Sequence, residues 1–290
     1  MTDLPLPLTQ SHAFERTCVA LNLTVKRVQS DAGTCLIQSR TLPVIGGFHL
    51  VSRGPVAAKP ESAAELLQMM RQMTKGPLVI NAPARMPTPR GLKIAAGADL
   101  AILDLSAPGE MRARMHQKWR NQLNKAERSP LRVTHEALDL EQHRWFLDAE
   151  STQQKSRRYK SYPTGFLLAY AATNPGEARM FIAKLGQAPV AGLLVLKHGL
   201  MATYQAGVTT LLGRQHCAHN LLLWNAMQDL QAQGCLRLDL GRTDLSPGLK
   251  RFKTSSGARI EQLAGSFLSH SWLTRRELQR PEYDSRIAVN

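Results

Sequence analysis

The sequence is short of acidic residues and of long hydrophobic runs. Its 290 residues include 22 Asp and Glu against 37 Lys and Arg, which gives a net charge of +15. The best apolar run, residues 188–196, is about half of the roughly 18 residues that cross a bilayer, so we expect a buried strand there and no transmembrane segment. The excess of positive charge predicts an anionic partner, which on charge alone is an RNA, a phosphorylated small molecule or an anionic membrane face.

Several signatures of catalysis and targeting are also missing. The four cysteines include no C-x-x-C pair and the nine histidines have no metal-ligand spacing, which argues against a zinc or redox site. The absence of G-x-S-x-G, H-E-x-x-H and Walker motifs disfavours a hydrolase or a metalloenzyme, so we expect no metal and no tightly bound cofactor. The amino terminus has Asp3, Pro5 and Pro7 where a secretory signal has cations and an apolar block, so we expect a cytoplasmic protein.

Hydrophobic residues make up 43% of the chain, enough for a globular fold, and the length favours two domains. The first half predicts a short helix from Gln10, a meander of strands ending near Ser52, a helix from about residue 62, and strands at 77–81 and 98–105. The second half repeats this order, with strands at 179–185, 189–197 and 200–207, a helix over 221–230 and a strand at 236–240. We expect an α/β protein of two like-folded domains, 1–107 and 108–272, each a twisted mixed sheet flanked by helices, and a basic tail at 273–290.

The segment 111–128 predicts one helix with two contrasting faces. One face is apolar and predicts packing against a core. The other carries the cations Arg114, Lys118, Lys125 and Arg128, which repel one another at i,i+4 spacing. Arg120 lies at the edge of this row. Either the cationic face is only solvated, or a bound phosphate relieves the repulsion.

A second basic stretch interleaves four cations over residues 155–160 with Tyr159 and Tyr162. This combination favours a nucleic-acid strand, because the cations neutralise its backbone while the rings stack on its bases. A solvated basic loop is the alternative.

The densest cluster of charge follows a predicted strand, in L-R-L-D-L-G-R-T-D-L-S-P-G-L-K-R-F-K over residues 236–253. Asp239, Arg242 and Asp244 stand at the carboxyl end of a predicted parallel strand, where α/β folds place ligands. Phe252 and Lys253 follow shortly after. The alternative to a functional site is an Asp–Arg pair that fixes a loop, with solvated lysines beside it.

Landmarks along nearly the whole chain carry a family resemblance. They are Gln10-Ser11 with Phe14, Ser52-Arg53-Gly54-Pro55-Val56, Lys118-Trp119-Arg120-Asn121 through Lys125-Ala126, Val190-Ala191-Gly192, Tyr204, Leu222 to Trp224, Leu238-Asp239-Leu240-Gly241-Arg242, Gly248, Phe252-Lys253 and Gly257. In this order they resemble the Fem family of peptidoglycan-bridge aminoacyltransferases and the wider BioF-like acetyltransferase group. Both have a twin-GNAT fold, which the resemblance implies here.

The resemblance implies N-acyl transfer, with an aminoacyl group passing from a charged tRNA to an amine of a cell-wall peptide precursor. Lys253 then meets the tRNA end or the developing oxyanion, and Phe252 stacks on a terminal base. We expect Lys253 or Arg242 to stabilise the oxyanion, and Asp239 to orient Arg242 or to accept the proton. Tyr204 belongs, by resemblance, to the substrate-binding residues.

We expect Arg53, Arg120 and Lys125 to bind the acceptor's phosphates, because planar arginine guanidinium groups and paired cations suit pyrophosphate. Residues 141–163 are too few for the helical hairpin arm of staphylococcal-type Fem proteins. Acyl-CoA enzymes of the GNAT fold use a Q/R-x-x-G-x-G/A loop, and this chain has residues 214–219, R-Q-H-C-A-H, without either glycine. An acyl-CoA donor is the second hypothesis, and a non-catalytic protein that binds RNA or an anionic envelope precursor is the third.

Overall fold

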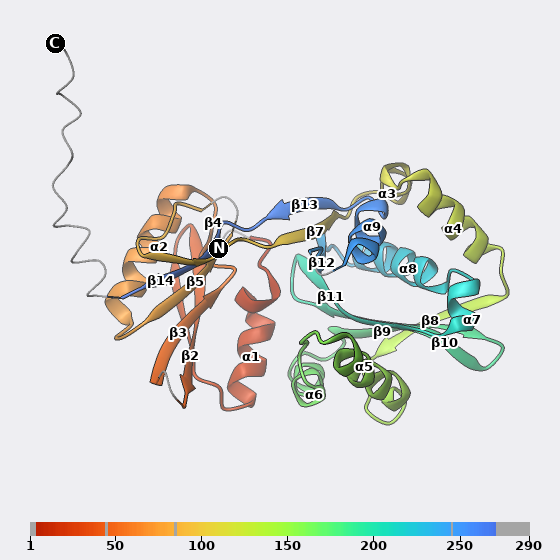
Figure 1. Cartoon of the computed structure of the whole chain (residues 1–290), viewed down its shortest axis with the longest axis horizontal. Helices are drawn as coiled ribbons and strands as arrows, with labels where there is room; N and C mark the ends of the chain where they lie inside the picture. Colours follow the sequence, from red (N-terminus) through yellow and green to blue (C-terminus); the bar gives the residue numbers. More distant parts are fainter. Residues whose placement is uncertain (1–3, 44–45, 84–85, 245, 271–290) are drawn as a thin grey trace, which may run out of the picture.

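The structure is a computed structural model and describes residues 4–43, 46–83, 86–244 and 246–270. In these residues the chain forms two mixed sheets side by side, each flanked by helices (Figure 1). This confirms the predicted α/β class with two tandem sheets. The predicted basic tail, 273–290, lies outside the described residues.

The first sheet contains seven strands. They are β1 (Val25–Ser30), β2 (Gly33–Leu42), β3 (Gly46–Ser52), β4 (Val56–Ala57), β5 (Leu78–Ala82), β6 (Leu92–Ala95) and β14 (Gly265–Ser269). Their order is β1-β2-β3-β5-β14-β6, with β4 paired to β2. The β1-β2-β3 antiparallel meander matches the prediction from the alternating sequence, and β3 and β5 are parallel.

The second sheet also contains seven strands. They are β7 (Asp99–Asp104), β8 (Leu131–Ala137), β9 (Ala178–Leu185), β10 (Ala188–Lys197), β11 (Met201–Thr209), β12 (Arg237–Arg242) and β13 (Arg259–Gln262), in the order β13-β7-β12-β11-β10-β9-β8. The turns after β9 and β10 use Gly186 and Gly199, whose φ values of 62° and 83° favour glycine. The parallel pairing of β11 with β12 confirms the parallel strand predicted ahead of Asp239.

The two sheets do not divide at Pro108. β7, which precedes this residue, pairs with β12 and β13 in the second sheet, whereas β14 returns from the second half to pair with β5 and β6 in the first. Figure 1 shows β7 and β13 crossing the junction side by side. The physical reason is long-range strand pairing, which places each strand by its hydrogen-bond partner and not by its position in the sequence.

The helices of the described residues are η1 (Leu8–Gln10), α1 (His12–Ala20), α2 (Pro60–Met73), α3 (Pro108–Arg114), α4 (Gln117–Glu127), α5 (Arg144–Arg157), α6 (Thr164–Thr173), α7 (Leu211–Gln215), α8 (Ala218–Ala232) and α9 (Pro247–Ser255). None of the helices in those ranges is long and apolar enough to cross a membrane. As expected from the chain length, residues 141–163 hold only the single helix α5 and a loop, with no hairpin arm.

The helix predicted over 111–128 is broken into α3 and α4. Met115 is extended (ψ 140°), and the Nδ1 atom of His116 caps α4 by accepting a hydrogen bond from the Lys118 amide at 3.2 Å. The break lets Met115 and Trp119 both reach the core, at 2% exposure each. The predicted continuous cationic face is therefore wrong, because Arg114 belongs to a different helix from the other cations.

Three hydrophobic clusters form the core instead of the two expected. One lies between the second sheet and α4 and α8, and another lies under α2 in the first sheet. The third joins both halves, because Phe14 on α1 packs with Phe166 on α6 at 5.5 Å between ring centroids. In Figure 1, α1 stands between the first sheet and the second domain. The domains therefore share buried apolar surface, which opposes their separation.

Candidate active site

The parallel strands β11 and β12 separate soon after they meet. They are paired only over Met201–Thr203 and Arg237–Asp239. β12 also pairs with β7 along its other edge, from Arg237 to Arg242, while β11 continues along β10 to Thr209 with Gln205 as an extra, bulged residue. We call residues 203–209 and 239–242 the fork. Where two strands separate, their backbone N–H and C=O groups lose the neighbouring strand as a hydrogen-bond partner and are free to bond to side chains instead.

Lys253, singled out in the sequence, lies at the fork. Its side chain extends from α9, is only 7% exposed, and donates from Nζ to the carbonyl oxygen of Arg242 at 2.8 Å. Burial lowers the pKa of Lys253 to about 8, against the opposing attraction of Asp239 and Asp244. The site thus holds a buried cation that loses its proton slightly above neutral pH.

Asp239 pairs with Arg53 across the two domains. The carboxylate is 2% exposed and accepts hydrogen bonds from Nη1 of Arg53 and, at 2.7 Å, from the amide of Gly241. Arg53 follows β3 in the first sheet, so this ion pair fastens the first domain to the fork. Sequence reasoning singled out both residues but did not connect them.

The predicted contact between Asp239 and Arg242 does not form. Arg242 pairs with Asp244 at 2.6 Å, and this pair is exposed, with side-chain exposures of 54% and 40%. The pairing of β12 with β7 is irregular between Asp239 and Arg242, where Gly241 has a φ of 76°, and Arg242 lies at the exposed end of the strand while Asp239 is buried. Only the backbone carbonyl of Arg242 reaches Lys253.

The predicted convergence of Arg53, Arg120 and Lys125 is also wrong. Arg120 donates to the carbonyl of Ala113 at 3.1 Å, and Lys125 is exposed on α4. Figure 1 places α4 at the side of the second domain away from the first. Arg53, by contrast, follows β3 of the first sheet and pairs with Asp239 of β12. These cations therefore do not form one phosphate site.

Tyr204 belongs to the fork, and His219 and Phe252 pack beside it. The hydroxyl of Tyr204 is 2.8 Å from Nε2 of His219, and burial lowers the pKa of His219 to about 4, so its ring is neutral. The Phe252 ring packs against His219 at 5.7 Å and Trp119 at 6.1 Å between centroids. Phe252, which the family resemblance predicts to stack on a terminal base, therefore already packs part of its ring against protein side chains.

Glu150 is a buried carboxyl group that sequence reasoning missed. It is 4% exposed and accepts hydrogen bonds from the hydroxyl of Tyr159 at 2.8 and 2.9 Å, and burial raises its pKa. Gln153 links this group to the fork by donating to Gly207 O at 3.1 Å. Glu150 sits among polar residues of α5 and carries no motif that marks it. Tyr162, expected to stack on bases, instead stacks on Phe166 inside the shared core at 4.2 Å.

The turn before α8 lies where acyl-CoA enzymes of the GNAT fold have the glycines of their Q/R-x-x-G-x-G/A loop. Cys217 has a φ of 54°, a left-handed conformation that favours glycine, and it precedes the buried Ala218. The helix start has no side-chain cap. The backbone therefore makes the turn expected of an anion-gripping loop while carrying side chains where that loop has none.

Comparison with known proteins agrees with this geometry. Residues 113–254 match the family model of the acetyltransferase (GNAT) domain. No curated protein matches the chain in sequence. A crystal structure of FemX has a TM-score of 0.74 and 14% identity, covering 94% of both chains. The C-terminal domain of a putative lysylphosphatidylglycerol synthetase from Agrobacterium fabrum has a TM-score of 0.58 and 13% identity, covering 93% of this chain and 91% of that one.

A third structure, L-PGS from Bacillus licheniformis, has a TM-score of 0.52 and 15% identity, covering 91% of this chain and 94% of that one. At such identities the likeness concerns the fold, and the family match concerns the second half. Residues 113–254 thus match the GNAT acetyltransferase domain and the described chain has a Fem-like twin-GNAT fold, which together support an acyltransferase.

Proposed function

We propose that this acyltransferase moves an aminoacyl group from an aminoacyl-tRNA to an amine of an anionic cell-wall peptide precursor. The observation that carries the proposal is the buried ammonium group of Lys253 at the fork, beside the Arg53–Asp239 pair. The net charge of +15 suits two anionic substrates. The fold shared with FemX supports the same chemistry.

In the reaction a neutral amine attacks the ester carbonyl of the donor, a C–N bond forms, and negative charge develops on the carbonyl oxygen. The ester C–O bond then breaks, and the proton lost by the amine nitrogen passes to the leaving tRNA oxygen, so the products are an amide and a free tRNA hydroxyl. Lys253 stabilises the oxyanion, because a charged donor in a water-poor site is worth more than in bulk water. Because both oxygens of Asp239 accept hydrogen bonds, we assign it to holding Arg53 and not to accepting the proton.

An acyl-CoA donor is the second candidate, and the family match over residues 113–254 favours it. Cys217 and His219, which stand where that motif has Gly and Gly or Ala, weigh against it, because a pyrophosphate grip needs close access to backbone amides. A non-catalytic protein that binds RNA or an envelope precursor is the third candidate. We further propose that the protein acts in the cytoplasm, with peripheral contact to an anionic membrane face.

A transfer assay separates these candidates. Purified protein receives either labelled aminoacyl-tRNA or a panel of labelled acyl-CoA compounds, with a nucleotide-linked muropeptide as the acceptor. We expect label to pass from the aminoacyl-tRNA to the acceptor amine. Transfer from acyl-CoA alone would replace the proposed donor, and no transfer from either donor, with salt-sensitive RNA binding, would favour the third candidate.

The matched variants Lys253→Met and Lys250→Met test the residue assignment. Both remove one ammonium group from α9, but Lys250 is exposed, with 51% of its side chain accessible. We expect transfer to fall by about two orders of magnitude or more for Lys253→Met and to change little for Lys250→Met. Equal activity of both variants would remove Lys253 from the mechanism.

A further inference from the structure

Gln10 is a buried amide to which neither the fork nor the family resemblance assigns a role. It ends η1 and is 0% exposed. Its Nε2 donates to the carbonyl oxygens of Ser52 at 2.9 Å and Leu36 at 3.2 Å, and its Oε1 accepts from the amide of Leu36 at 2.7 Å. The side chain therefore joins β2 to the end of β3.

The Gln10 amide takes the place of a strand partner. The antiparallel ladder of β2 and β3 extends from the hairpin as far as the pair of Gln38 and Leu50. The same register would next place Leu36 opposite Ser52, but backbone groups of both residues bond to Gln10 instead. Because buried backbone groups need partners, this amide allows the chain to leave the sheet after Ser52 without losing hydrogen bonds.

Arg53 stands in the turn that Gln10 holds. Its φ is 57°, a left-handed conformation that a residue other than glycine keeps only where its surroundings hold it. The next residue, Gly54, packs so closely on the Gln10 amide that an added Cβ would lie 2.7 Å from Cδ. The backbone amide of Arg53 also donates to the carbonyl of Asn81 at 2.9 Å. These contacts fix the backbone from which the guanidinium reaches Asp239.

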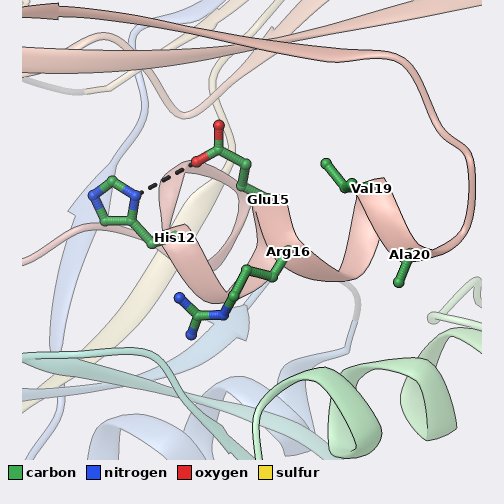
Figure 2. A pocket seen from close by; sticks show the side chains of 5 residues that line it. All are labelled: His12, Glu15, Arg16, Val19 and Ala20. Carbon is green, nitrogen blue, oxygen red and sulfur yellow. Dashed lines mark ion pairs between the residues drawn. The ribbon is translucent and has the colours of Figure 1, made fainter.

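The backbone of Gln10 is itself fixed at the start of α1. Its carbonyl oxygen accepts from Nη1 of Arg27 at 3.0 Å, and Nε of the same guanidinium donates to Glu15 at 2.6 Å. Figure 2 shows Glu15 in the first turn of α1, with His12 directed to the same carboxylate at 3.4 Å. Gln10 is therefore anchored to both β1 and α1.

The ion pair of Arg53 and Asp239 carries this constraint to the fork. Asp239 also accepts from the amide of Gly241 at 2.7 Å. The next residue, Arg242, offers the carbonyl oxygen to which Nζ of Lys253 donates at 2.8 Å. Because each step is a hydrogen bond, a displaced Arg53 changes the surroundings of the Lys253 ammonium group.

We propose that Gln10 is a positioning residue of the acyl-transfer site. Its amide holds the turn at Arg53, Arg53 holds Asp239, and Asp239 with Gly241 keeps the Lys253 ammonium group in place for the developing oxyanion. The task of Lys253 in transfer rests on the proposed function. The link from Gln10 to Lys253 does not depend on the identity of the acyl donor.

The pKa of Lys253 tests this link without any acyl donor, by NMR titration of the full chain with isotope-labelled lysine. In the wild type this pKa is about 8, and Asp239 and Asp244 attract the ammonium group. In Gln10→Met, Arg53 no longer offsets the charge of Asp239, so we expect the pKa of Lys253 to rise by at least roughly half a pH unit. An unchanged pKa overturns the proposal.

Asn174→Leu is the matched control. Asn174 is also a buried amide, 2% exposed, and its Nδ2 donates to the carbonyl oxygens of Tyr170 at 3.0 Å and Ala13 at 3.3 Å. Its hydrogen bonds join α6 to α1 and do not involve the Arg53 turn. We expect the pKa of Lys253 and the transfer rate to stay unchanged in this variant, and equal effects of Asn174→Leu and Gln10→Met overturn the proposal.

Steady-state transfer then separates positioning from substrate binding. We expect Gln10→Met to lower kcat at least roughly tenfold while KM changes less than about twofold, because the oxyanion exists only in the transition state. Arg53→Lys should act through the same path, so the double variant should be about as slow as the slower single variant. Losses that multiply overturn the proposal.

Gln10→Glu, which keeps the length and the Oε1 acceptor but loses the donor to Ser52, replaces Gln10→Met in every comparison if the latter fails to fold. If the wild type transfers from neither donor, the proposed function fails, and the pKa of Lys253 alone decides whether Gln10 holds the site.

Discussion

Replacing Lys253 with Met is expected to increase the stability of the protein at neutral pH while it abolishes most of the transfer activity. Methionine is close to lysine in length and removes the charge without opening a large cavity. Lys253 is 7% exposed, and its burial lowers the pKa from the usual 10.5 to about 8. Function and stability therefore oppose each other at this residue.

The size of the effect follows from the pKa. A fall from 10.5 to about 8 corresponds to about 3 kcal/mol lost by keeping the charge in the folded state, at about 1.4 kcal/mol per pH unit. The variant also loses the hydrogen bond to the carbonyl of Arg242, worth about 1 kcal/mol. A net gain of about 2 kcal/mol in the free energy of unfolding is expected at pH 7.

The stability difference between Lys253→Met and the wild type is expected to change with pH in a defined direction. Below pH 8, Lys253 is protonated in both the folded and the unfolded state, so the cost of burial is complete. Between pH 8 and 10.5 the unfolded chain holds more protons, and the wild type gains stability as pH rises. The advantage of Lys253→Met over the wild type is therefore expected to shrink across this interval.

Urea unfolding of the wild type, Lys253→Met and Lys250→Met at pH 7 and pH 10 measures this difference. Lys250 serves as the control because it is exposed on the same helix. A Lys253→Met variant clearly less stable than the wild type at pH 7, or a difference that stays constant up to pH 10, would refute the account of a buried, costly cation.

Three further predictions concern packing, the domain junction and thiol reactivity. Gly207→Ala is expected to lower the unfolding midpoint, at a cost of about 1–3 kcal/mol, because the added Cβ overlaps the Tyr204 hydroxyl; an unchanged midpoint would show that the ring has room to move. Arg53→Met is expected to cost about 3–5 kcal/mol in urea unfolding by leaving Asp239 buried and unpaired, and adding Asp239→Leu should recover part of this loss; additive effects would argue against coupling. Burial raises the pKa of Cys35, so its thiol is expected to remain unmodified by Ellman's reagent until the chain unfolds, as followed by mass spectrometry.

Local patterns predicted many elements of the fold correctly. The alternation in β1 to β3 and the parallel strand ahead of Asp239 both depend on residues close together in sequence, where periodicity acts directly. The break at Met115 was missed because the burial of Met115 and Trp119 overrides the helical pattern that continues through them.

The sequence by itself determined the charge, the α/β class, the likeness to the Fem family and the position of Asp239 on a parallel strand, with Lys253 shortly after it. Only the tertiary structure decided which charged side chains pair. Asp239 pairs with Arg53, 186 residues away in the sequence, and not with Arg242. It also turned His219 inward and buried Glu150. The physical reason is that spacing in sequence fixes which face of an element a side chain occupies, whereas its partner depends on how distant elements pack and desolvate it.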